Sequence, residues 1–169
     1  MAVAAGRAPA YSSPMFTIEA ATIDDIDVLV EQSGALFLED AGRYDTFIDF
    51  TWSEREGRAD FERLIASDDC LVLVARAGRE AVAHLVGYIH AASPTRQPVT
   101  YANLRSLYVA PTSRRQGVGD ALTQAFVNWA RAEGSAEAHV DAYAANEPAQ
   151  RLYERHGFLV RSTARALGL

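Results

Sequence analysis

The stretch from Tyr101 to Gly134 constrains the fold of this chain more than any other part of the sequence. Its apolar first part, residues 101–109, predicts a β-strand. An amphipathic helix is predicted over residues 118–133, and Gly134 suits the left-handed residue that often follows a helix. Because its apolar face must be buried, this strand and helix together predict helices packed on a sheet. That face consists of Val118, Ala121, Leu122, Ala125, Phe126, Trp129 and Ala130.

The remaining elements are predicted to alternate in the order β-α-α-β-β-β-α-β-α-β. Strands are expected at residues 15–20, 70–76, 82–91, 136–143 and 158–164. Helices are expected from Thr22 or Asp24 through Leu36, around Phe61, and over residues 148–156. The predicted fold class is therefore α/β (α+β), with a mixed, mostly antiparallel sheet flanked by helices.

Length and composition restrict the kind of protein. The 169 residues suit a single domain over residues 15–169, and the Ala-, Ser- and Pro-rich residues 1–14 predict a disordered arm. A net charge of -6 argues against nucleic-acid binding, and an apolar run long enough to cross a membrane is lacking. The single cysteine, Cys70, fits a reducing compartment, so a cytoplasmic location is predicted.

The loop before the predicted helix has the composition of an anion site. Arg114 and Arg115 place two cations beside the glycines Gly117 and Gly119, at a helix start whose N–H groups lack partners. The lysine of a P-loop is missing, and Leu122 stands where a dinucleotide-binding motif has its third glycine. A local phosphate site is the interpretation we favour, and a flexible surface turn is the alternative.

Three motifs in register resemble the GNAT superfamily of N-acetyltransferases. They are the strand Leu107-Tyr108-Val109 followed by Ala110-Pro111, then Arg114-x-x-Gly117-x-Gly119, and finally Asn146-x-x-Ala149-x-x-Leu152-Tyr153-x-x-x-Gly157-Phe158. About 27 residues separate the second motif from the third. The resemblance is close from Ser106 to Phe158, whereas further upstream only the order of strands and helices agrees.

The resemblance implies that the ligand is acetyl-CoA. Its pyrophosphate would lie on the N–H groups at the helix start, and its pantetheine arm would add to the central strand like a further strand. Either arginine of the loop could face the phosphates. Asn146 would cap its helix or reach the pantetheine. The implied binding residues are Leu107, Tyr108, Val109, Arg114, Arg115, Gln116, Gly117, Val118, Gly119, Asp120, Asn146 and Tyr153.

The implied reaction is direct attack of an amine on the acetyl thioester. A backbone N–H from the central strand, that of Leu107 or Tyr108, would stabilise the oxyanion. Tyr153 would donate a hydrogen bond to the departing sulfur, although a core aromatic is the alternative interpretation of this residue. Relatives carry a glutamate base on this strand, whereas this chain has Asn103, Arg105 and Ser106 there. The base is therefore unassigned, with Asp141 or a bound water, held with the help of Tyr143, as candidates.

The molecule that accepts the acetyl group is the least determined feature of the implied reaction. Acidic and aromatic residues concentrate between Glu39 and Arg58, so a small cationic amine is predicted, with an ordinary solvated face as the alternative. Protein lysine or N-terminal acetylation is a second hypothesis, and a non-catalytic acyl-CoA sensor is a third. No metal is expected, because His84 and His90 lack further ligands. A homodimer is possible by analogy with relatives.

Overall fold

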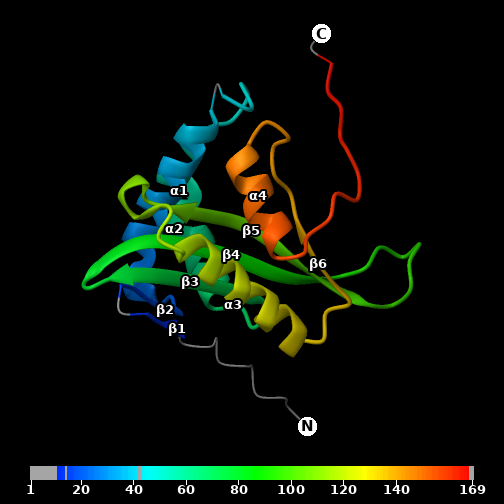
Figure 1. The fold of residues 1–169 in the computed structure, drawn as a ribbon, viewed down its shortest axis with the longest axis horizontal. Coiled ribbons are helices and arrows are strands. Elements are labelled where there is room, and N and C mark those ends of the chain that lie inside the picture. The colour runs from blue at the N-terminus through cyan, green and yellow to red at the C-terminus, as the bar shows by residue number, and fades with distance from the viewer. Residues whose placement is uncertain (1–10, 14, 42, 168–169) are drawn as a thin grey trace.

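The computed structural model describes residues 11–13, 15–41 and 43–167. Its centre is a mixed sheet with the strands in sequence order (Figure 1), antiparallel throughout except for the parallel pair β5–β6. This architecture confirms the predicted fold class. The strands are β1 (Tyr11–Ser12), β2 (Thr17–Ala20), β3 (Cys70–Ala77), β4 (Glu80–Ala91), β5 (Thr100–Val109) and β6 (Glu137–Val140).

Helices cover both faces of the sheet, as Figure 1 shows. On one face α1 (Ile26–Asp40) and α2 (Trp52–Ile65) bury Ile26, Leu29, Phe61 and Leu64 against Val86 and its neighbours. On the other face α3 (Val118–Ala132) packs its apolar stripe, as predicted, and α4 (Glu147–Arg155) follows β6. None of the described helices combines the length and apolar character that a bilayer crossing requires.

A bulge in β5 sets which side chains face which layer. Val86 pairs with Ser106 but Gly87 pairs with Leu104, so Arg105 is an extra residue in β5. Arg105 and Ser106 therefore both project toward α1 and α2: Arg105 reaches α2, and Ser106 contacts a buried side chain of β4. Leu104 and Leu107 instead belong to the core cluster under α3.

The second half of β5 has an open edge. The pairing with β6 runs only from Tyr101↔Glu137 to Leu104↔Val140, and beyond it no described strand lies beside β5 on that side. The Ala110 N–H donates to Val82, so the main-chain groups of every second residue face β4. By alternation, those of Leu107 and Val109 face the open side.

Two predictions near the termini differ from the structure. The strand predicted over residues 158–164 is wrong: no strand forms there, because Gly157 turns the chain with φ 83 and only Phe158 packs, on Tyr153. Leu159 and Val160 remain exposed. Within the predicted N-terminal arm, Tyr11–Ser12 form β1, whereas residues 1–10 and 14 lie outside the described part of the chain.

Candidate functional site

The loop that enters α3 has two residues in the left-handed region. After β5 the chain makes a short 3-10 turn, Pro111–Ser113, and then passes through Arg115 (φ 61) and Gly117 (φ 82). A left-handed backbone is unusual for an arginine and costs free energy, which makes this loop a candidate for function. In the described chain the N–H groups of Val118, Gly119 and Asp120 find no acceptor, so the turn leaves a concave row of free donors.

The two arginines of this loop have different surroundings. Arg114 donates from Nε to the Val109 carbonyl oxygen at 2.8 Å and from its guanidinium to Glu39 at 2.5 Å. It also lies over the ring of Tyr108. Arg115 is exposed, and no described residue is an ion-pair partner for it. Arg115 is therefore the cation that remains available at the mouth of α3.

The glycines and Gln116 shape this loop in separate ways. A Cβ on Gly117 would meet open space, so the demand there is conformational. A Cβ on Gly119 would lie 3.5 Å from Leu152 and 3.8 Å from Val109, in ordinary contact, so this glycine leaves room between α3, α4 and β5. The Gln116 side chain donates to the Thr112 carbonyl at 2.9 Å and closes the turn.

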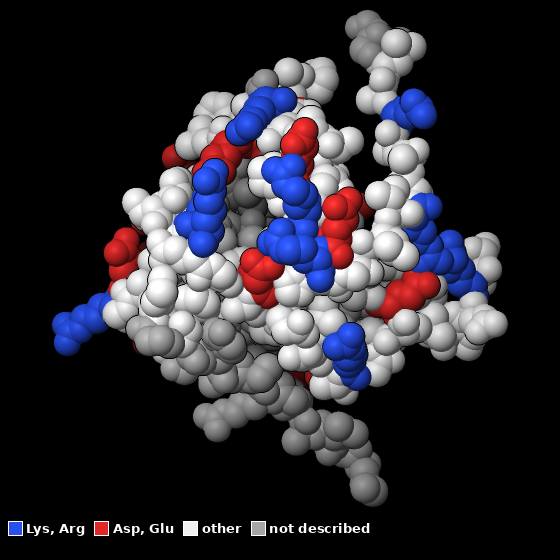
Figure 2. Space-filling view, in the orientation of Figure 1, with Lys and Arg blue, Asp and Glu red and all other residues white. Residues whose placement is uncertain are grey.

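Helix α4 borders the same opening. Asn146 caps it, since its Oδ1 accepts a hydrogen bond from the Ala149 N–H at 3.2 Å. Arg155, on α4, donates to the Asp120 carboxylate at 3.0 Å and so ties α4 to the first turn of α3. The Asp120 side chain is thus engaged, whereas its backbone N–H is not. The surface is hollowed between α4 and the loop before α3, with basic side chains on both rims (Figure 2).

Tyr153 is partly buried and packs against the core cluster under α3, as Leu107 and Val109 do. Its ring meets that of Phe158 with centroids 5.8 Å apart. Burial raises the pKa of its phenol to about 12. The described residues provide no hydrogen-bond partner for its hydroxyl, which leaves this donor free for a ligand.

The face of β5 that lies against α1 and α2 holds a series of hydrogen-bonded polar side chains that was not predicted from the sequence. His84, on β4, is wholly buried, and its Nδ1 lies 3.1 Å from Oε1 of Gln32 on α1. Nε2 of the same ring lies 3.4 Å from the Ser106 hydroxyl. Burial, assisted by the positive charge of Arg105, lowers the pKa of His84 to about 4. In the sequence, the spacing of His84 and His90 indicated only a pair of metal ligands, and no role for His84 in a hydrogen-bond chain.

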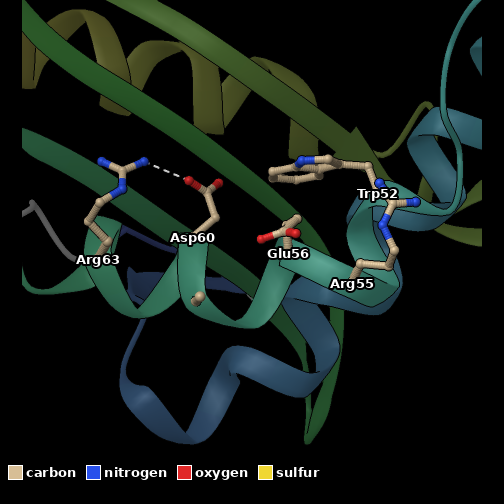
Figure 3. Close-up of a pocket in the computed structure, with 6 residues that line it drawn as sticks. Trp52, Arg55, Glu56, Asp60 and Arg63 are labelled. Carbon is tan, nitrogen blue, oxygen red and sulfur yellow. Dashed lines mark hydrogen bonds and ion pairs between the residues drawn. The ribbon is translucent and has the colours of Figure 1, made fainter.

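An open cavity of about 510 Å³ lies along α2 (Figure 3). Asp60 at its wall accepts from Arg105 at 2.7 Å and from Arg63 at 2.6 Å. Burial works to raise the pKa of Asp60, but the hydrogen bonds from these arginines lower it overall. The arginine of the β5 bulge thus connects this cavity to the central strand. The lining residues are Trp52, Arg55, Glu56, Ala59, Asp60 and Arg63.

The acidic and aromatic segment predicted to border the acceptor is distributed over several contacts, and its Trp52 and Glu56 line the α2 cavity. Asp49 binds Arg55 at 2.9 Å, and Glu39 binds Arg114. Tyr44 stacks on Tyr143 with ring centroids 5.2 Å apart, which joins the loop after α1 to the segment after β6. Asp141, the base candidate, is exposed and has no ion pair within the described residues.

Comparisons with known proteins agree with this geometry. The Acetyltransferase (GNAT) family matches residues 37–158, whereas a search of curated proteins finds no match. A variant of the BH1408 protein from Bacillus halodurans has the same fold, with TM-score 0.82 and 19% identity over 90% of this chain and 98% of that one. A predicted acetyltransferase from Clostridium acetobutylicum, solved with acetyl-CoA, gives TM-score 0.73 and 18% identity over 91% of this chain and 96% of that one.

An aminoglycoside 6′-N-acetyltransferase from Acinetobacter haemolyticus gives TM-score 0.68 and 20% identity, covering 90% of this chain and 97% of its own. At such identities the structural likeness establishes the fold, and the family match extends over more than half of the chain. The fold, the open strand edge and the family match lead to one conclusion: this chain belongs to the acetyltransferase (GNAT) family.

Proposed function

We propose that this protein transfers an acetyl group from acetyl-CoA to the primary amine of a small molecule. The observation that carries the proposal is the pair of unpartnered main-chain sets in the described chain, one at Leu107 and the Val109 N–H on the open edge of β5 and one at residues 118–120 at the start of α3. These two sets suit a ligand that combines an extended amide arm with a diphosphate.

The residues present fit the coenzyme. The N–H groups from Gln116 to Asp120 would hold the diphosphate, and Arg115 is the cation available to assist them. The main-chain groups of Leu107 and the N–H of Val109 would bind the pantetheine arm. The carbonyl of Val109 accepts from Arg114, so Arg114 acts on the strand edge rather than at the phosphates. When bound, acetyl-CoA supplies the activated acetyl thioester.

Strand alternation supports Leu107 as the oxyanion donor. Ala110 bonds to β4, so the N–H of Tyr108 also faces β4, and that of Leu107 faces the opening. A preorganised backbone donor of this kind stabilises the charge that develops on the acetyl oxygen.

Tyr153 would act by hydrogen bonding rather than by giving up its proton. With a pKa of about 12, full transfer to a thiolate near 8.5 is uphill by about 5 kcal/mol. A hydrogen bond that strengthens as charge grows on sulfur avoids this cost. Tyr153→Phe removes only the hydroxyl, so we expect kcat to fall about 100-fold, with little change in the Kd for acetyl-CoA.

The test is thiol release from acetyl-CoA with a panel of amines: tobramycin, spermidine, glucosamine 6-phosphate and a lysine peptide. The panel includes an aminoglycoside because an aminoglycoside acetyltransferase is among the fold neighbours. Tyr101→Phe, which alters a tyrosine at the far end of β5, is the matched control. Turnover of the peptide alone would favour protein acetylation, and calorimetric binding without any release would favour an acyl-CoA sensor. Full kcat in the Tyr153→Phe variant would remove this residue from the mechanism.

A further inference from the structure

We propose that Ser106, backed by His84 and Gln32, receives the proton that the attacking amine loses. This inference rests on the proposed acetyl transfer and supplies the base that the sequence leaves unassigned. It depends on three contacts that join α1, β4 and β5 into one chain of hydrogen bonds.

The direction of each hydrogen bond follows from the Gln32 end. The Gln32 amide nitrogen donates to the Ala81 carbonyl at 2.8 Å, which leaves its Oε1 as the atom facing His84. An amide oxygen only accepts, so Nδ1 of His84 must carry the ring proton. In the neutral ring Nε2 is then an acceptor, and the Ser106 hydroxyl must donate to it. Serine, imidazole and a third group that orients the imidazole are arranged as in nucleophile–base pairs.

Burial keeps this arrangement in one protonation state. His84 is enclosed by Phe61 from α2 and stacked on Tyr108, and Arg105 is the cation that faces it. The Asp60 carboxylate on α2 is held by Arg105 and Arg63. The ring therefore stays neutral near pH 7, with Nε2 free to accept.

The bulge places Ser106 where an acceptor could reach it. Ser106 is half-buried, directly precedes Leu107, and lies at the point where β6 has left β5. Its side chain faces the α1–α2 layer, whereas Tyr153 packs on the opposite face with Leu107. One face of the opening thus offers a proton acceptor, and the other offers a donor for the leaving sulfur.

The proposed step balances as follows. The amine nitrogen forms a bond to the acetyl carbon while the π pair of the C=O moves to the oxygen beside the Leu107 N–H, and this pair re-forms the C=O when the C–S bond breaks. The nitrogen becomes positively charged, which makes its N–H far more acidic than that of the free amine. That proton moves to the Ser106 oxygen while the hydroxyl proton of Ser106 moves to Nε2 of His84. The C–S bond breaks, and the thiolate takes a proton from solvent. Imidazolium His84 then returns its proton through Ser106 to water. A weak base suffices, since only the charged adduct needs to be deprotonated.

Two carboxylates, Asp60 and Asp141, are less suited than Ser106 to take the proton from the amine. Asp60 already accepts hydrogen bonds from Arg105 and Arg63, one on each carboxylate oxygen, so it is engaged on the α2 side of the strand. Asp141 lies in solvent beyond β6, with no group among the described residues to orient it. Within the described residues, Ser106 combines a position beside Leu107 with the oriented imidazole of His84 behind it.

The first test is independent of turnover. Long-range ¹⁵N–¹H NMR of the imidazole in the full-length protein should report the Nδ1–H tautomer near pH 7. In Gln32→Met, which removes the orienting oxygen, we expect this tautomer to lose its dominance. An Nε2–H tautomer in the unaltered protein would overturn the relay, because Ser106 could not then donate to His84.

The second test is kinetic, with the fastest amine of the panel described above. Ser106→Ala should lower kcat about 100-fold while changing the KM for acetyl-CoA less than twofold. The difference in kcat between the variant and the unaltered protein should narrow as pH rises, because hydroxide then replaces the relay as the proton acceptor. Ser106→Thr keeps a hydroxyl and should recover most of kcat. Ser135→Ala, which removes a buried hydroxyl before β6, is the control. Full kcat in Ser106→Ala refutes the relay, whereas failure of the unaltered protein to bind acetyl-CoA refutes the proposed function instead.

Discussion

The buried imidazole makes the stability of this protein depend on pH in a predictable direction. The pKa of His84 is about 4 in the folded protein and 6.5 when exposed, so the unfolded chain binds the proton more tightly. A lowered folded pKa means that the stabilisation is complete above pH 6.5 and is lost as pH falls toward 4. Across the whole shift the loss is about 3 kcal/mol, of which about 2 kcal/mol falls between pH 7 and pH 5.

The assay is urea unfolding at pH 7 and pH 5 for the natural chain and for His84→Gln, which removes the titrating group. The difference in unfolding free energy between the two proteins should shift by about 2 kcal/mol over this interval. His90→Gln, which replaces an exposed histidine on the same strand, should follow the natural chain. Ser106→Ala should also follow it, because burial is the main cause of the shift.

Equal pH dependence in the natural chain and in His84→Gln would refute the reasoning. If His84→Gln does not fold, the pKa of His84 can be measured directly from its ring resonances in the natural protein. They should show no titration between pH 7 and pH 5, and a midpoint near 6.5 would contradict the account.

The remaining predictions concern packing and ligand binding. Gly87→Ala places a Cβ 2.8 Å from the Phe126 ring and should lower the unfolding free energy by about 1–3 kcal/mol in urea titrations, whereas Gly34→Ala, with only an ordinary 3.8 Å contact, should not. Arg115→Ala should weaken acetyl-CoA binding several-fold in calorimetry, and this loss of affinity should shrink at high salt. Arg114→Ala should weaken acetyl-CoA binding less than Arg115→Ala does. A larger effect of Arg114→Ala would show that we have assigned the two arginines wrongly.

Much of the fold was predictable because local signals agreed with tertiary packing. The apolar period of residues 118–132 and the turn at Gly78 led to α3 and to the β3–β4 hairpin. The strand predicted after Gly157 failed for a physical reason. The apolar residues after Gly157 have the pattern of a strand, but a strand forms only where the edge of another strand is available for pairing. The pattern of apolar residues does not show whether such an edge is available.

The candidate site could be located from the sequence only where it uses main-chain groups. Gly117 and the helix start identify the loop because backbone conformation leaves a mark in the sequence. The contact between Ser106 and His84 leaves no such mark, since it joins two strands through a bulge that shifts their register. Similarly, Arg114 and Arg115 are equivalent in the sequence, and only their folded neighbours separate them.

The extra residue in β5 has a consequence for how this enzyme can change. On either side of Arg105, odd and even positions exchange the layers that they face. Deleting Arg105 would restore a regular ladder in which Ser106 still faces Val86 and Leu107 still faces the α3 layer, but it would remove the side chain that reaches Asp60 on α2. The layers of the later residues thus depend on their register with β4, so loss of this one codon would cut the link to α2 without exchanging the two surfaces of the strand.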